Sequence, residues 1–223
     1  NGRRRQRQMC IRDRYIELLD ALNSHFQHTP YLLGGSPCIG DFGLLAPLYG
    51  HLARDPHPAA LMKKRAPGVY RWVERMNRAS QDAQEYFNCD TDFFQKNEIP
   101  ETLIAVLRVL SQDFIPETVA SAKCLNVWLS EQNPKTGSPA VFQLGTSPIG
   151  NVEFKVRDRV IKAAIVPYRH FQLQRMHQIF DEVETKVQMQ IKQILKSCGM
   201  ADLLNIRLNR LIGRRDNLEV WLD

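Results

Sequence analysis

The sequence has no apolar run long enough to cross a membrane, and its first residues carry charge without the apolar stretch of a secretory signal. Its five cysteines are widely spaced and form neither a CxxC pair nor a Cys/His metal-ligand pattern. Glycine-rich phosphate-binding motifs and a nucleophile elbow are also absent. We therefore expect no membrane partner and no metal, and a cytoplasmic protein with reduced thiols rather than a disulfide framework.

The composition is that of a soluble globular protein. The chain has 223 residues, of which 43% are apolar and 24% are charged. This length is compatible with one or two domains, and the apolar content is sufficient for a packed core.

The first fourteen residues read as a basic arm, which would favour binding to nucleic acid or to an anionic membrane. However, residues 4–14 match, residue for residue, the conceptual translation of a transposase-based sequencing adapter. We therefore interpret residues 1–14 as adapter-derived and set them aside in reasoning about the fold. On this interpretation we also expect the natural N-terminus to be missing.

Most of the positive charge lies in this arm. Residues 1–14 hold six Arg and one Asp, a net charge of +5, whereas the whole chain carries +6. Without the arm the chain is nearly neutral, which removes the main electrostatic support for binding to nucleic acid. The basic clusters at residues 63–65 and 214–215 are interpreted as solubilising surface, and we expect no nucleic-acid partner.

Residues 34–42 are the most informative stretch of the chain. Two glycines and a proline end one helix, and Cys38 followed by Asp41 has the spacing of a capping box that begins another. A thiol is a weak acceptor, so Asp41 is expected to hold the helix start nearly alone. The helix that follows is apolar almost all round and is predicted to be buried in the centre of a helical domain; its apolar residues are Phe42, Leu44, Leu45, Ala46, Leu48, Tyr49 and Leu52.

The remaining pattern predicts a mainly α protein with a few short strands. Prolines at 100 and 116 are each expected to open a helix, and residues 79–98 to form a surface connection whose aromatics pack on the helices. After the breaker at 133–139, alternation within 140–166 predicts two or three short strands or an extended arm. The other expected elements are helices over 15–26, 39–53, 61–64 and 67–78, a turn at 54–58, one long helix over 167–197 and a hairpin within 207–222.

The segment from Leu33 to Phe42 resembles the entrance to the central helix in the C-terminal domain of the glutathione S-transferase superfamily. The residues that carry the resemblance are Leu33, Gly34, Pro37, Cys38, Ile39, Gly40, Asp41 and Phe42, together with residues 47–52 and 66–76. The chain departs from the family at the cap, where Ser or Thr is usual and Cys38 stands here.

The resemblance implies a helical domain over 15–132, followed by an extension over 133–223. It also implies a thioredoxin-like domain of about 80 residues before the chain, a size within the usual domain range. That domain would bind glutathione as co-substrate and supply the catalytic residues, so no catalytic or glutathione-binding residue is assigned here and the chain alone is expected to be inactive. The family further implies a homodimer. The alternative is a non-catalytic binding or scaffold module that kept the fold.

A few polar residues are candidates for chemistry. Tyr49 and His51, on the expected central helix, are candidates for a substrate pocket, although packing is the simpler interpretation. Asp41 and Cys38 are assigned a structural role at the helix start, with a redox role for Cys38 as the alternative. His170 and His177 are interpreted, with Asp181, as a solvated helix face rather than as metal ligands.

Overall fold

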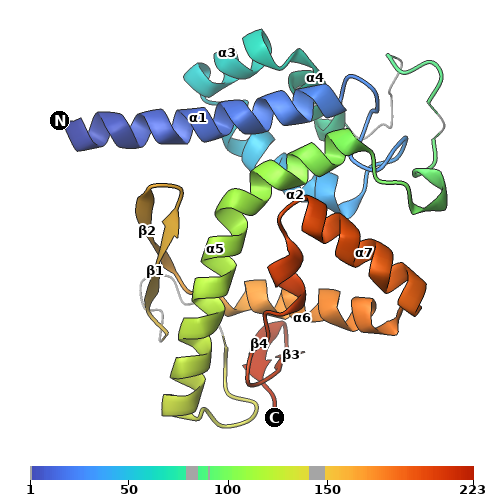
Figure 1. Cartoon of the computed structure of the whole chain (residues 1–223). Helices are drawn as coiled ribbons and strands as arrows, with labels where there is room; N and C mark the ends of the chain where they lie inside the picture. Colours follow the sequence, from blue (N-terminus) through green and yellow to red (C-terminus); the bar gives the residue numbers. More distant parts are fainter. Residues whose placement is uncertain (1, 79–84, 90, 141–148) are drawn as a thin grey trace. The chain divides into compact units, whose positions relative to one another are not determined.

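The computed structural model describes residues 2–78, 85–89, 91–140 and 149–223 of the chain. It divides the chain into two compact units, Asn1–Val109 and Leu110–Asp223, and helix α5 (Glu101–Gln132) contributes to both. The sequence pattern places the boundary later, at 132/133. The mainly α fold class with a few short strands is confirmed (Figure 1). Among the described residues no helix is long and apolar enough to span a membrane.

The first unit is a helical bundle built around helices α1 (Gly2–His25) and α4 (Pro67–Asn77). Between them lie α2 (Ile39–Pro47), a single π-helical turn η1 (Leu48–Leu52) and α3 (Pro56–Arg65). A short 3-10 turn, η2 (Gln95–Asn97), precedes α5. The rings of Phe26 and Trp72 stack with centroids 5.1 Å apart, and they anchor a core that includes Leu19, Leu22, Met62, Val69 and Val73.

The expected turn at 54–58 is wrong in its second half, because α3 begins at Pro56. Proline is well suited to the first helical turn, where its missing N–H has no partner to lose. Asp55, which the sequence pattern assigns to the turn, instead stands at the N-cap position. The same arrangement opens α4 at Pro67, as the sequence predicted.

The expected burial of the central helix is also wrong in part. Within α2 and η1 only Asp41 and Leu48 are buried, whereas Ile39 is 91% exposed and Phe42 is 58% exposed. Leu44 and Leu45 are half-buried. The first unit therefore covers one side of this helix and leaves an apolar side uncovered.

The second unit combines the C-terminal part of α5 with two small antiparallel sheets and two helices. Strands β1 (Asn151–Val156) and β2 (Arg159–Ala164) form one hairpin, and β3 (Ile212–Arg215) and β4 (Leu218–Trp221) form another. Helices α6 (Pro167–Glu182) and α7 (Thr185–Ser197) and the 3-10 turn η3 (Ala201–Leu204) lie between the hairpins in sequence. The core includes Leu125, Leu129, Ala140, Val152, Phe154, Val156, Ile165, Ile212 and Trp221.

Both hairpins follow from the sequence pattern. In β1 the buried residues Val152, Phe154 and Val156 alternate with exposed ones, as expected of a strand with one covered face. The β3–β4 turn has Asp216 and Asn217 at φ 50° and 62°, the left-handed conformation that tight two-residue hairpins require. The third strand suggested around residues 141–144 lies outside the described residues.

Two helix predictions need correction. Pro116 does not open a new helix but lies inside α5, where the Thr118 hydroxyl donates to the Phe114 carbonyl at 2.7 Å. The single long helix over 167–197 is in fact two, because Val183 and Glu184 are extended between α6 and α7. The Gln188 side chain donates to the carbonyls of Phe180 and Val183 at 3.0 and 3.2 Å, which compensates for the interrupted helical hydrogen bonds.

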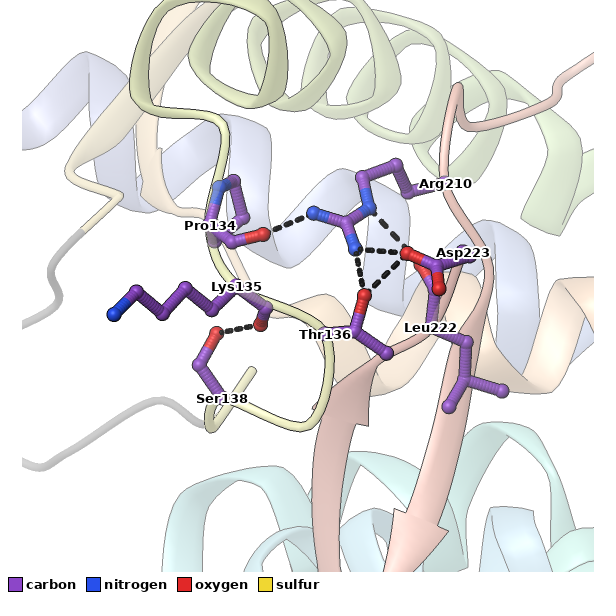
Figure 2. A network of polar contacts seen from close by, with 7 residues as sticks. All are labelled: Pro134, Lys135, Thr136, Ser138, Arg210, Leu222 and Asp223. Atoms are coloured by element: carbon purple, nitrogen blue, oxygen red, sulfur yellow. Dashed lines mark hydrogen bonds and ion pairs between the residues drawn. The ribbon is translucent and has the colours of Figure 1, made fainter.

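The C-terminus of the second unit is held by Arg210 (Figure 2). Its guanidinium donates to the carbonyls of Pro134 and Leu222, to the Thr136 hydroxyl at 2.9 Å and to the Asp223 carboxylate at 3.2 Å. Thr136 in turn donates to Asp223. One side chain thus joins the loop after α5 to the last two residues of the chain.

Candidate functional site

The start of α2 is organised around the buried carboxylate of Asp41, which is 0% exposed. Its Oδ2 accepts the backbone N–H of Cys38 at 2.9 Å. Its Oδ1 accepts the N–H of Leu32 at 3.1 Å and the indole N–H of Trp72 at 2.9 Å. One carboxylate therefore joins the loop before α2, the start of α2 and the middle of α4.

Cys38 occupies the N-cap position, with its thiol facing the backbone N–H of Asp41 in a reciprocal capping box. Burial, the largest cause, raises the pKa of the Cys38 thiol, and the nearby Asp41 carboxylate acts in the same direction. A raised pKa lowers the thiolate fraction at neutral pH, and the thiolate is the reactive form. The geometry therefore favours the structural role over the redox alternative.

The structure places the two substrate-pocket candidates on the η1 turn. Tyr49 is half-buried, and its hydroxyl accepts a hydrogen bond from Arg54 at 3.3 Å while the Arg54 guanidinium lies 5.5 Å from its ring centroid. His51 is exposed. Neither residue lines either of the two cavities described below.

Sequence reasoning missed a second buried hub in the first unit, at Arg75 on α4. This side chain is almost fully buried and donates to the Glu85 carboxylate and to the Pro30 carbonyl, each at 2.6 Å. Its guanidinium carbon lies 5.3 Å from the ring centroids of both Tyr31 and Tyr86. Because the partners come from distant segments, an arginine at a helical position gave no local signal of this role.

A groove of about 510 Å³ lies beside this hub, and its described lining residues belong to the first unit. One side is the loop between α1 and α2, which contributes the backbone of Gly34 and Gly35. The other side is formed by residues 85–89 and 92–95. Its lining residues are His28, Thr29, Gly34, Gly35, Glu85, Tyr86, Phe87, Asn88, Cys89, Asp92, Phe93, Phe94 and Gln95.

The histidines of α6 are not on a solvated face, so that interpretation is corrected. His170 and His177 are 4% and 5% exposed. The Nε2 atom of His177 bonds to the Leu203 carbonyl at 2.6 Å, and burial lowers the pKa of this imidazole. Both side chains line a small cavity of about 40 Å³ in the second unit.

His170 also forms a buried pair with Ser121, whose hydroxyl lies 2.9 Å from Nε2. Burial lowers the pKa of His170 to about 4, and the Nδ1 atom has no hydrogen-bond partner among the described atoms. A catalytic serine requires an accessible hydroxyl and a histidine oriented by a third group. This pair has neither, so its geometry fits a structural contact.

The described residues bring together no cluster of His, Cys, Asp and Glu that could hold a metal ion. Among the residues whose side chains the structure describes, the cysteines at 38, 89, 124 and 198 form no disulfide bond, and Cys198 is fully buried. Across the part of the chain that the structure describes, we find no nucleophile with an activating base in an accessible site.

Part of the first unit is similar to a known protein family. Residues 4–75 match the family described as "Glutathione S-transferase, C-terminal domain". The matched region contains Asp41, Trp72 and the whole of α2, and it starts inside the segment interpreted as adapter-derived. The match covers about a third of the chain, and this part is similar to that domain. Searches of curated proteins and of solved structures gave no match.

Proposed function

We propose that this chain is the helical part of a glutathione-transferase-like protein that uses glutathione to conjugate or reduce small electrophiles in the cytoplasm. The observation that carries the proposal is the Asp41 capping box within the matched region, because it stabilises the start of α2 from both neighbouring elements. A thioredoxin-like domain, outside residues 1–223, would bind glutathione and lower the pKa of its thiol. The chain by itself is then inactive, since the glutathione thiol attacks an electrophile as a thiolate, which that domain would stabilise.

The uncovered side of α2 supports a further partner within the full-length protein. Ile39 and Phe42 are strongly exposed, and they are large apolar residues one helical turn apart. Surfaces of this kind are commonly covered by another domain or subunit. In our proposal the thioredoxin-like domain, the second subunit of a homodimer, or both cover this side.

The test compares two proteins, the chain alone and the longest natural reading frame that contains residues 15–223. Glutathione conjugation to an activated aryl halide and glutathione-dependent disulfide reduction are measured for both. We expect activity in the longer protein only. A longer protein that folds but neither binds glutathione nor turns over either substrate would replace the proposal with the alternative of a non-catalytic scaffold module.

A further inference from the structure

The groove beside Arg75 has the dimensions of a small-molecule site. Its volume of about 510 Å³ falls within the range of about 300–1,000 Å³ that is usual for ligand pockets. All its described lining residues belong to the first unit. None of them is among the residues assigned to the start of α2 or to a substrate pocket.

The two sides of the groove are held in place by contacts within the first unit. Two hydrogen bonds join the loop between α1 and α2 to residues 92–94: the Gly35 N–H donates to the Asp92 carbonyl at 2.8 Å, and the Phe94 N–H donates to the Leu33 carbonyl at 2.9 Å. Glu85 is fixed by Arg75, and the Tyr86 hydroxyl donates to the Phe26 carbonyl. A groove with fixed sides costs a ligand little ordering entropy, which favours binding.

Two aromatic side chains along the groove are strongly exposed. Phe87 is 92% exposed and Phe93 is 51% exposed, although the sequence pattern predicted that aromatics of this segment would pack on the helices. Tyr86 and Phe94 of the same segment are half-buried, and the Tyr86 hydroxyl donates to the Phe26 carbonyl. The two phenyl rings therefore offer faces on which a flat ligand can stack.

The charged side chains among the described lining residues are acidic. They include the carboxylates of Glu85 and Asp92 but no lysine or arginine. Glu85 is already paired with Arg75, whereas the described residues supply no cationic partner for Asp92. Aromatic faces beside an uncompensated carboxylate attract cations through both charge and the ring quadrupole.

We propose that this groove binds a small flat organic cation, such as an aryl amidine, guanidine or amine, which stacks on Phe87 or Phe93 with its charge at Asp92. The proposal is independent of glutathione chemistry, because it uses none of the residues that support the proposed function. A neutral ligand of the same shape would have the stacking but not the charge interaction, and an anion would be repelled.

The test uses benzamidine as the probe, with benzamide as its neutral analogue and benzoate as its anionic one. Binding to the whole chain is measured by calorimetry at pH 8. We expect benzamidine to bind about tenfold more tightly than benzamide, which corresponds to one favourable charge contact, and benzoate not to bind. Equal affinity for the three probes, or no binding at millimolar concentration, overturns the proposal.

Variants locate the site. Asp92→Asn keeps the shape of the side chain and is expected to weaken benzamidine about fivefold, the effect of one partly exposed charge pair. Phe87→Ala removes an exposed ring and is expected to weaken benzamidine and benzamide alike. Phe114→Ala is the matched control, because Phe114 is a 43% exposed phenylalanine in the other unit. Unchanged benzamidine affinity in Asp92→Asn refutes the role of the carboxylate.

Thiol alkylation provides a readout that does not depend on variants. Cys89 lines the groove and is half-buried, and Cys124 is a half-buried thiol of the second unit. Saturating benzamidine is expected to slow alkylation of Cys89 and to leave that of Cys124 unchanged, as measured by mass spectrometry of the two peptides. Equal rates at Cys89 with and without the probe would place any binding elsewhere.

Discussion

The strongest test of the fold is the replacement of Asp41 by asparagine. The asparagine side chain would keep an oxygen in place of Oδ1, which accepts from Leu32 and Trp72, but its amide group would replace Oδ2, which accepts from Cys38 at 2.9 Å. Two donors would then face each other at the start of a helix. Loss of a charge-assisted hydrogen bond and of the favourable interaction with the helix dipole together cost about 2–4 kcal/mol.

This cost would be a large part of the free energy of unfolding, which for single domains is about 5–15 kcal/mol. The measurement is urea unfolding of the whole chain followed by far-UV circular dichroism. We expect Asp41→Asn to lower the midpoint strongly without changing the slope, because the surface exposed on unfolding stays the same.

Asp20→Asn is the matched control for this experiment. Asp20 pairs with Arg65 at 2.7 Å, but both side chains are about half exposed, so solvent screens the pair and its loss is expected to have little effect on stability. If Asp41→Asn were no more destabilising than Asp20→Asn, the three hydrogen bonds would not hold α2 and the structural assignment of Asp41 would be wrong.

Two further predictions concern a glycine pair and a buried histidine. Gly34→Ala is expected to destabilise the protein by about 1–3 kcal/mol, because Gly34 has φ +118° and a Cβ atom there would lie 2.8 Å from the Asp92 carbonyl oxygen. Gly43→Ala is its control: Gly43 lies in open space within α2, and this change is expected to stabilise the protein by about 0.5–1 kcal/mol. Equal effects of the two changes in thermal melts would contradict the conformation of the loop at Gly34. Because burial lowers the pKa of His170 to about 4, the unfolded chain binds a proton more readily, so stability is expected to fall as pH decreases from about 6.5 to 4. We measure the free energy of unfolding by urea titration at several pH values in this range. His170→Gln is expected to reduce the dependence of this free energy on pH by up to about 1.4 kcal/mol per pH unit. An unchanged pH dependence would show that His170 is not buried as a neutral group.

The local features of the fold were predictable because their causes are local. The capping spacing of Cys38 and Asp41, the proline that opens α4, and the alternation in β1 depend on residues a few positions apart. The hydrogen bonds that Asp41 accepts from Leu32 and Trp72 were not predictable, because they depend on how α4 packs against the loop between α1 and α2. The same holds for the groove, whose two sides are about fifty residues apart in sequence.

The break between α6 and α7 could not be read from periodicity, because the apolar stripe continues through it in phase. Met176, Phe180 and Val183 lead without interruption to Val187 and Ile191 at helical spacing. The break depends on backbone conformation at Val183 and Glu184 and on a side-chain hydrogen bond from the next helix. Neither changes the hydrophobic pattern.

Helix α6 shows why the polar residues of the extension were misread. Its buried residues are Pro167, His170 and His177, whereas Ile179 is 64% exposed. Gln174, on the same side, donates to the Ile212 carbonyl and accepts its N–H, both at 3.0 Å. A polar side chain on a helix usually indicates solvent, but each of these has a hydrogen-bond partner inside the second unit, and a buried polar group with a partner costs little. Hydrogen bonds are directional, so these contacts fix where Ile212 and Leu203 lie along α6. Apolar contacts alone would fix these positions less specifically.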